Sequence, residues 1–277
     1  MLAITTCRAY PEPPPNLLPL ADRLNAQGIS TRFDIWQNHP DTPYLLPLCV
    51  WDYAAAPQQF AGWLATAETC RQRFINPPEL MRWNMDKRYL CDLAAWGADV
   101  VPCVYGPSES ESVWETVRQN GWREAVVKPA VGQSGRFVCK ISADGKLPDL
   151  SVYPQGLIIQ PYIREIEQCG ETSIIFFGGR FSHAVHRCPP QGEWRANSAY
   201  GVTVSPVSVP ESALSTAQGI FAKLPQIPAY ARIDGILAGN RFLLNELELI
   251  EPALYLHTAE GATERLAAVL AGILSEG

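Results

Sequence analysis

The sequence predicts an α/β protein in which a small open α/β domain precedes a larger α+β region. Strand-like and helical segments alternate over the first 75 residues, which is typical of a parallel sheet covered by helices. Further along, short strands follow one another through glycine-containing turns, which favours antiparallel pairing. With 277 residues, 47% of them hydrophobic and 18% charged, the chain can form a large core and two or three subdomains.

The N-terminal segments predict a parallel sheet flanked by helices. Apolar runs indicate strands at 2–9, 30–36 and 44–53, and apolar positions at helical spacing indicate helices at 16–28 and 58–70. Ligands of open α/β sheets bind beyond the carboxyl ends of the strands. We therefore expect a substrate pocket near Arg8, Trp51 and Asp52.

The later segments alternate between helices and strands. Asp86 is predicted to cap a helix that Lys87 opens and Gly97 ends. A β-hairpin is predicted to turn at Gly178-Gly179. Further helices are expected at 108–121 and 258–277, and further strands at 124–130, 136–141 and 157–163.

Charge and cysteine usage exclude several classes of protein. A formal net charge of -6 without a block of Lys or Arg argues against nucleic-acid binding. No apolar run approaches the roughly 20 residues that span a bilayer, and the start lacks a signal peptide, so we expect a cytoplasmic protein. The eight cysteines are scattered without a CxxC pair, which favours reduced thiols. His183 and His186 point to opposite faces of a strand, which rejects a zinc site.

Three segments could bind a phosphorylated ligand. In "KPAVGQSGRFV" (128–138), Lys128 ends a strand, and the glycine-rich loop could present backbone N–H groups to phosphate; a flexible hairpin loop is the alternative. "LIIQPYI" (157–163) could offer main-chain groups to a flat ligand such as adenine, or be an ordinary strand end. "HRCPPQGEWRANSAYG" (186–201) reads as a loop whose Arg187, Arg195 and Asn197 could clamp phosphate or carboxylate, or face solvent.

The segment "ARIDGILAGNRFLLNELELIEP" (231–252) predicts two antiparallel strands with a polar and an apolar face. A loop of three residues, 239–241, places Asp234 opposite Glu246 and Arg232 opposite Glu248, with leucines and isoleucines on the other face. Asn245 then lies on the apolar face. Carboxylates this close repel by about 2 to 3 kcal/mol at an effective dielectric near 20. One arginine cannot neutralise three carboxylates, so we expect Mg²⁺ there; a solvated polar face is the alternative.

The order of these segments resembles the ATP-grasp superfamily of ligases, in its glutathione-synthetase-like branch. Over roughly residues 75–256 the resemblance rests on "NPPELMRWNMDKRYL", "KPAVGQSG", "IIQPYI", "CGETSIIFFGGRFSHAVHR", "GEWRAN", "ARIDG" and "NELELIEP". The C-terminal part is most similar to the cycloserine-forming ureidoserine cyclo-ligases. The resemblance implies an ATP-grasp fold in which two α+β subdomains grip ATP. Its expected divisions are an N-terminal domain at 1–80, a helix and linker at 81–107, a lid subdomain at 108–160 and a metal- and phosphate-binding subdomain at 161–277.

The resemblance also implies roles for single residues. The expected catalytic residues are Arg232, Arg195 and Asn197, and the expected metal ligands are Asp234, Glu246 and Glu248. Glu248 replaces an asparagine of many family members. Either Glu165 or Glu167 would reach the ribose. The expected ATP-binding residues are Lys87, Lys128, Gly132, Gly135, Gln160, Ile163 and Glu167.

The implied activity is ligation of a small carboxylate to a nitrogen. ATP would phosphorylate the carboxylate, an amine or an aminooxy or ureido nitrogen of the same molecule would capture the acyl phosphate, and ADP and phosphate would leave. The implied cofactors are ATP and two Mg²⁺ ions, which Mn²⁺ could replace, and a homodimer is an option. The alternatives are a catalytically silent ATP-binding module and a small-molecule kinase.

Overall fold

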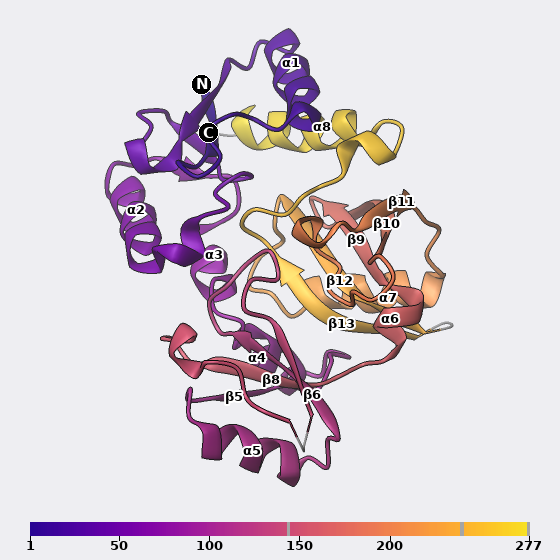
Figure 1. Ribbon diagram of the computed structural model, residues 1–277. Coiled ribbons are helices and arrows are strands. Elements are labelled where there is room, and N and C mark those ends of the chain that lie inside the picture. The colour runs from indigo at the N-terminus through magenta and orange to yellow at the C-terminus, as the bar shows by residue number, and fades with distance from the viewer. Residues whose placement is uncertain (143–144, 239–240, 276–277) are drawn as a thin grey trace.

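The computed structural model describes residues 1–142, 145–238 and 241–275, and the strands within these ranges form three sheets (Figure 1). They are the N-terminal, central and lid sheets. The N-terminal sheet has the order β2-β1-β3-β4 with every pair parallel, as predicted. Its strands are β1 (Leu2–Thr6), β2 (Thr31–Ile35), β3 (Tyr44–Leu46) and β4 (Arg73–Phe74), and its predicted helices are α1 (Leu18–Ala26) and α2 (Pro57–Thr69).

The predicted strand at 44–53 is wrong beyond Leu46. Pro47 has no N–H to donate to a ladder, and the chain leaves the sheet at this point. The backbone N–H of Leu48 turns back to the carbonyl oxygen of Leu46 at 3.0 Å, and that of Cys49 bonds to the carbonyl oxygen of Thr5 at 3.0 Å. The residues that follow therefore form a loop at the carboxyl edge of the sheet.

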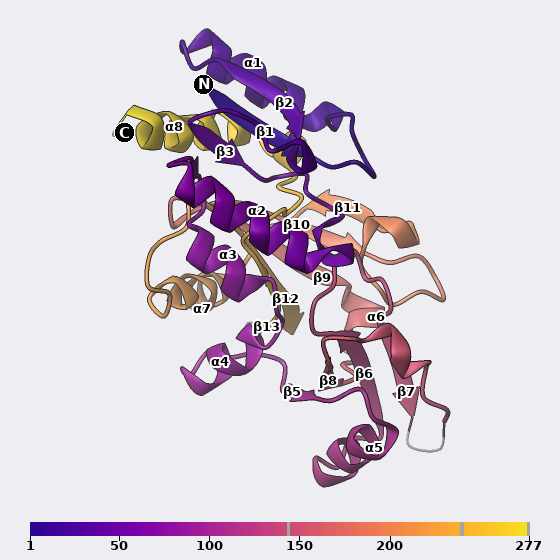
Figure 2. The same cartoon turned by 90° about the vertical axis from the view of Figure 1, so that its left-hand side faces the viewer.

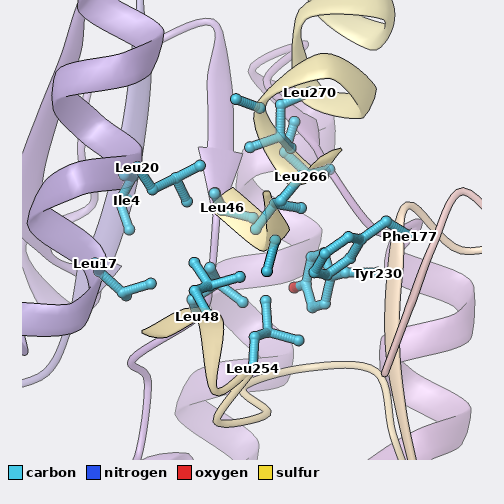
Figure 3. Close-up of a cluster of buried hydrophobic side chains, with 14 of the residues drawn as sticks. Ile4, Leu17, Leu20, Leu46, Leu48, Phe177, Tyr230, Leu254, Leu266 and Leu270 are labelled. Carbon is cyan, nitrogen blue, oxygen red and sulfur yellow. The ribbon is translucent and has the colours of Figure 1, made fainter. Parts of the chain in front are cut away.

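The C-terminal helix packs against the N-terminal domain. Helix α8 (Ala262–Ser275) lies beside α1 (Figures 1 and 2), although the two are separated by most of the chain. Figure 3 shows Leu266 and Leu270 of α8 meeting Leu20 and Ile4, all of them buried. The segment predicted as the last helix is thus part of the core that the first residues begin.

The central sheet is antiparallel, with the order β11-β10-β9-β12-β13. The hairpin at Gly178-Gly179 is confirmed, because Arg180 pairs with Phe177. An unpredicted helix, α7 (Glu211–Phe221), covers one face through buried residues such as Ile220 and Phe221. The strands are β9 (Glu171–Phe177), β10 (Arg180–Cys188), β11 (Thr203–Pro206), β12 (Tyr230–Ala238) and β13 (Arg241–Glu248).

The lid sheet has the order β5-β8-β6-β7 and carries helix α5 on its outer face. Side chains of β6 alternate, so that Ala125 and Val127 pack against α5 while Val126 and Lys128 point inward to the central sheet. Between residues 161 and 170 lies the short helix α6 (Glu165–Cys169). The other elements are β5 (Val104–Gly106), α5 (Ser110–Gln119), β6 (Glu124–Pro129), β7 (Cys139–Ser142) and β8 (Leu157–Pro161).

The predicted register between β12 and β13 is confirmed at the polar face. Asp234 lies opposite Glu246 and Arg232 opposite Glu248. The predicted loop is wrong at Arg241, which pairs with Ala238; residues 239–240 lie outside the described residues. The extra residue is Asn245, which has no partner in the ladder and forms a β-bulge.

The bulge also reassigns the faces of β13. Beyond it, Phe242 and Leu244 pack into the core under α7 in place of the expected Leu243, which is half-buried. Asn245 turns to the polar face, where its side-chain amide donates to Glu171 at 2.6 Å. The misfit that the predicted register left at Asn245 is thereby resolved.

The outer edge of β13 is covered by polar side chains and by the linker. Asn84, which ends helix α3 (Pro78–Asn84), donates to the carbonyl oxygen of Leu247 at 2.8 Å and accepts from the N–H of Leu249 at 2.9 Å. Tyr89, which begins helix α4 (Tyr89–Ala95), accepts from the N–H of Leu247 at 2.9 Å. These bonds fix the backbone of the strand that carries the predicted carboxylates.

Candidate functional site

A cavity of about 580 Å³ lies between the lid sheet and the central sheet. Its walls come from the N-terminal loops, the inner face of the lid sheet, the glycine-rich loop, the 194–199 loop and the ends of β12 and β13. Twelve of the sixteen predicted site residues line it, whereas Arg8, Asp52, Glu167 and Asp234 do not. The twelve are Trp51, Lys87, Lys128, Gly132, Gly135, Gln160, Ile163, Arg195, Asn197, Arg232, Glu246 and Glu248.

Each cavity-lining carboxylate of β13 has a cation beside it. Lys87 forms an ion pair with Glu246, and Arg232 forms one with Glu248. Burial raises the pKa of Glu248 to about 7 despite the nearby Arg232 guanidinium. The pKa of Glu246 is lowered, because the charges of Lys87 and Lys128 outweigh its desolvation. The two carboxyl groups therefore differ in protonation near neutral pH.

Beneath them lies a buried ionic layer built around Arg187. Its guanidinium contacts Glu171 and lies 2.8 Å from Asp234, whose exposed fraction is only 1%. Asp234 is also held by Arg232 at 2.9 Å and by the hydroxyl of Ser173 at 2.7 Å. These donors lower the pKa of Asp234 against the opposing effect of burial.

Two expectations about this region are corrected. Arg187 belongs to β10 and is 3% exposed, so it is not part of a loop. The charge count behind the expected metal is also incomplete, because the fold brings Arg187, Lys87 and Lys128 from other segments to these carboxylates. It brings two further carboxyl groups as well, those of Glu171 and Glu251.

The carboxylates nevertheless offer oxygen ligands of the kind that Mg²⁺ binds. Glu246 and Glu248 line the cavity with side chains that are 25% and 24% exposed. Asp234 is turned into the layer below. In the part of the chain that the structure describes, no three acidic, histidine or cysteine side chains converge closely enough to hold one ion. Two of the three predicted ligands thus fit a cation, and Asp234 fits only if its arginine contacts open.

The opposite wall is formed by the lid sheet. Lys128 is 5% exposed, and among the described residues its amine has no hydrogen-bond partner or ion pair. Burial lowers the pKa of Lys128 to about 8. The side-chain Nε2 of Gln160 is buried without a partner in the same residues, and the backbone N–H of Ile163 is likewise unused. Unpaired polar groups at a cavity wall are positions that a polar ligand can satisfy.

The glycine-rich loop and the 194–199 loop close over the cavity together. Gly135 has a φ of +68°, and a Cβ there would lie 2.5 Å from the side-chain oxygen of Asn197. Tyr200 donates to the carbonyl oxygen of Gly135 at 3.0 Å. Arg195 stacks on the ring of Tyr200 at 3.7 Å and pairs with Glu193 at 2.8 Å, which lowers the pKa of Glu193 to about 2. Contact this close explains glycine at position 135.

The predicted residues outside the cavity have identifiable surroundings. Asp52 accepts from the indole of Trp36 and from the amide of Gln37, both at 2.7 Å, so it organises the N-terminal loops. Arg8 is exposed to solvent. Glu167 is 50% exposed and accepts from the hydroxyl of Tyr162, and Glu165 is exposed as well. Neither glutamate lines the cavity.

Lys87 lies in the turn before α4, not at the first position of that helix. Asp86 caps the turn by accepting from the N–H of Arg88 at 2.9 Å, and the backbone N–H of Lys87 bonds to the carbonyl oxygen of Ala130 at 2.7 Å. Gly97 ends the helix with a φ of +80°, as predicted. The bond to Ala130 ties Lys87 to the strand that precedes the glycine-rich loop.

Several cavity residues were missed by the sequence predictions. Glu171 begins β9, and a carboxylate at the start of an apolar strand is a signal for a polar partner that the predictions did not use. Asn84 and Tyr89 act through backbone bonds that sequence spacing does not reveal. Glu251 and Tyr255 lie in the segment after β13 and line the cavity.

Comparison with known proteins identifies the family of the chain. The model of the N-terminal domain of D-cycloserine synthetase DcsG matches residues 2–76, and that of the ATP-grasp domain of prokaryotic glutathione synthetase matches residues 97–233. The cycloserine biosynthesis protein DcsG of Streptomyces lavendulae is 31% identical, over 72% of this chain and 73% of that protein. The chain belongs to the ATP-grasp ligases. It therefore performs ATP-dependent, ADP-forming ligation of a carboxylate to a nitrogen, and its family uses ATP with a divalent metal ion.

Solved structures agree with this membership of the ATP-grasp ligases. The crystal structure of D-cycloserine synthetase DcsG superposes with a TM-score of 0.84 at 25% identity, covering 99% of both chains. D-alanine–D-alanine ligase from Bacillus anthracis complexed with ATP superposes with a TM-score of 0.67 at 14% identity, over 99% of this chain and 96% of that one. The ligase PsnB, solved with Mg and ADP, reaches 0.65 at 12% identity over 98% of each chain. The last two likenesses show the ATP-grasp fold.

Proposed function

We propose that this ligase activates the carboxylate of an amino acid or a close derivative as an acyl phosphate and transfers it to a nitrogen. Lys87, Lys128 and Arg232 all line one cavity with the carboxylates of β13, Glu246 and Glu248, and this single observation carries the proposal. A bound nucleoside triphosphate needs cations around its phosphates. Cations held in fixed positions also stabilise the charge that develops during phosphoryl transfer. Ion pairs already hold Lys87 and Arg232.

Each wall has a proposed task. Gln160 and Ile163 supply unused polar groups for the adenine, and Lys128 meets the phosphates from the lid. Arg232 stabilises the charge that develops on the transferred phosphoryl group, and Arg195 and Asn197 approach it from the loop opposite. Glu246 and Glu248 would hold Mg²⁺, which would neutralise phosphate charge. For Asp234 to join them, its contacts with Arg187 and Arg232 have to open.

The binding position of the carboxylate substrate is proposed to lie against the N-terminal domain. Trp51, Tyr53 and Tyr10 line the cavity from that side, beyond the ends of the parallel strands. The rest of the cavity closes under the glycine-rich and 194–199 loops, which would keep water from an acyl phosphate. Ring closure within one substrate molecule, as the name D-cycloserine synthetase implies for the DcsG relatives, is the form of ligation we propose here.

A screen of ADP release tests this function. The protein is supplied with ATP, Mg²⁺ and a panel of amino acids, O-substituted serines and aminooxy compounds, and the products are analysed by mass spectrometry. We expect stimulated ADP release with a product that has lost water. A phosphorylated product that accumulates would indicate a kinase, and no stimulation by any compound would contradict the substrate class. Repeating the screen with Mn²⁺ and titrating each metal measures how many ions are needed.

The oligomeric state of the protein and its location in the cell also stay predictions. In the described residues no helix combines the length and apolarity needed to cross a membrane. A homodimer is tested by sedimentation, and a cytoplasmic location by cell fractionation.

A further inference from the structure

One carboxyl group in the cavity has no role in the function proposed above. Glu251 follows β13 and lines the cavity, yet among the described residues its carboxylate has no salt bridge and interacts by hydrogen bond only with its own backbone N–H. Burial raises its pKa well above the ordinary value, and the charge of Glu248 adds to that rise. A bound cation would relieve both effects, whereas a phosphate or a carboxylate would worsen them.

The backbone around Glu251 is held from several directions. The hydroxyl of Tyr230 donates to the carbonyl oxygen of Ile250 at 2.8 Å, and the indole N–H of Trp51 donates to that of Glu251 at 3.2 Å. Arg232 donates to the carbonyl oxygen of Ala253 at 3.2 Å. The main chain is therefore fixed while the carboxyl group has no partner from another residue, which is the arrangement of a preorganised binding group.

Aromatic residues line the same cavity. Trp51, Tyr53 and Tyr255 line the cavity with Glu251, and the ring of Tyr10 meets Trp51 edge to face at 6.0 Å. Carboxylates next to aromatic faces attract ammonium groups, because both the charge and the ring quadrupole are favourable. The charge of Lys87 reaches Glu251 as well and opposes the rise of its pKa.

We propose that Glu251, with Trp51 and Tyr255, binds the α-ammonium group of the substrate whose carboxylate is activated. This rests on the proposed function and narrows its substrate to amino acids with a free amino group. An amine held in this ion pair stays protonated and cannot attack the acyl phosphate. The attacking nitrogen is then a second and less basic one, such as an aminooxy or ureido nitrogen.

Paired substrates and the variant Glu251→Gln test this proposal. Each compound that stimulates ADP release is compared with its des-amino analogue. In the wild type we expect KM for the amino compound to be about 10- to 100-fold lower, because a hydrogen bond to a charged group is lost in the analogue. In Glu251→Gln the preference should vanish with KM for ATP unchanged, and Glu251→Asp should restore part of it. Glu260→Gln, an equal charge change on an exposed residue, is the matched control.

The outcomes separate the two proposals. Equal KM values for the amino and des-amino compounds in the wild type, or an unchanged preference in Glu251→Gln, overturn the ammonium site while leaving the ligase function standing. Absence of stimulation by every compound overturns the proposed substrate class and the ammonium site together. Binding of a nonhydrolysable ATP analogue to each variant shows that it is folded.

We also infer, from an independent observation, that Cys91 and Cys103 form a site of reversible disulfide formation. Their sulfur atoms lie 3.4 Å apart, and both residues are half-buried. Cys91 is on α4, and Cys103 directly precedes β5. Just before it, the N–H of Val101 bonds to the carbonyl oxygen of Leu244 in the central sheet at 2.8 Å, whereas Val104 pairs with Ile159 in the lid sheet. Cys103 therefore lies in the short connection between the two sheets that enclose the cavity.

The chemistry needs only a small disulfide such as oxidised glutathione. The hydrogen bond with Cys103 lowers the pKa of Cys91 to about 7, so a large share of it is thiolate. The Cys91 sulfur attacks one sulfur of glutathione disulfide and releases one glutathione. Cys103 then loses its proton, attacks the Cys91 sulfur and releases the second glutathione. Two protein thiols are oxidised by two electrons, and one glutathione disulfide is reduced to two thiols.

Oxidation of the whole protein tests this site. After incubation with oxidised glutathione we expect a linked peptide containing Cys91 and Cys103, a loss of two titratable thiols, and slower ADP release that dithiothreitol restores. Cys91→Ser should stay active under the same treatment, whereas Cys70→Ser, which removes an exposed thiol, should respond like the wild type. Absence of the linked peptide, or equal inhibition of Cys91→Ser and the wild type, would overturn the inference.

Discussion

Removal of the Arg187 guanidinium should destabilise the protein far more than removal of a surface arginine. In Arg187→Met, Glu171 and Asp234 lose the cation that they share. These two acidic residues are only 6% and 1% exposed. Removing one partner of a buried ion pair lowers the free energy of unfolding by about 3 to 5 kcal/mol. Asp234 keeps Arg232, and Glu171 keeps Asn245, so we expect the lower end, about 3 kcal/mol.

The matched control is Arg241→Met. Arg241 also makes a two-pronged contact with a carboxylate, at 2.9 and 3.0 Å from Asp99, but these side chains are 69% and 41% exposed. An exposed pair contributes under about 1 kcal/mol. By thermal denaturation, we expect Arg187→Met to melt roughly 6 to 12 °C below the wild type and Arg241→Met at most about 4 °C below it.

The pH dependence gives a second measurement on the same variant. Burial already raises the pKa of Glu171 in the wild type, and loss of Arg187 raises it further. A folded state with a raised carboxyl pKa binds more protons than the unfolded state, so its stability falls as pH rises from the unfolded value of about 4.3 to the folded value. The deficit of Arg187→Met should therefore be larger at pH 8 than at pH 5. Equal melting temperatures for the two methionine variants would refute this reasoning.

Three further predictions concern the cavity and its support. Glu246→Gln and Arg232→Ala should each lower ATP turnover more than about 100-fold while circular dichroism stays unchanged, and an unimpaired variant in a phosphate-release assay would contradict the assigned roles. Because the pKa of Lys128 is lowered to about 8 and only its protonated form attracts phosphate, binding of a nonhydrolysable ATP analogue should weaken about tenfold from pH 7 to pH 9. Lys128→Arg should bind with little pH dependence in the same titration, and an equally steep slope in both would be the contrary result. Asn84→Ala leaves the carbonyl oxygen of Leu247 and the N–H of Leu249 without their partner, so urea unfolding should show a loss of about 2 to 4 kcal/mol, and a loss below 1 would contradict the structural role.

The sequence was most informative for the pair of strands β12 and β13, where one face must be apolar and the other carries charged residues. Apolar and charged residues alternate at 231–234 and again at 246–249, which favours the register that puts Asp234 opposite Glu246, and the structure has that register. Its cause was misread, because a bulge at Asn245 shifts register just as a longer loop does. Alternation alone does not distinguish the two.

Contacts between distant segments were beyond the sequence argument. Lys87 reaches Glu246 across 159 positions of the chain, and Arg187 reaches Asp234 from another strand. Without these cations, the carboxylates seemed to require a metal for charge balance. The contacts of Asp52 were equally hidden in the sequence, because a polar residue at the carboxyl edge of a sheet can also hold the loops themselves.

The position of α8 has a consequence for synthesis of the chain. Leu2, Ile4 and Leu20 are synthesised more than 240 positions before Leu266 and Leu270, with which they share one core. The apolar face of the nascent N-terminal domain therefore stays uncovered until α8 has been made. A holdase chaperone should bind stalled nascent chains that end before residue 262 and dissociate once α8 can pack.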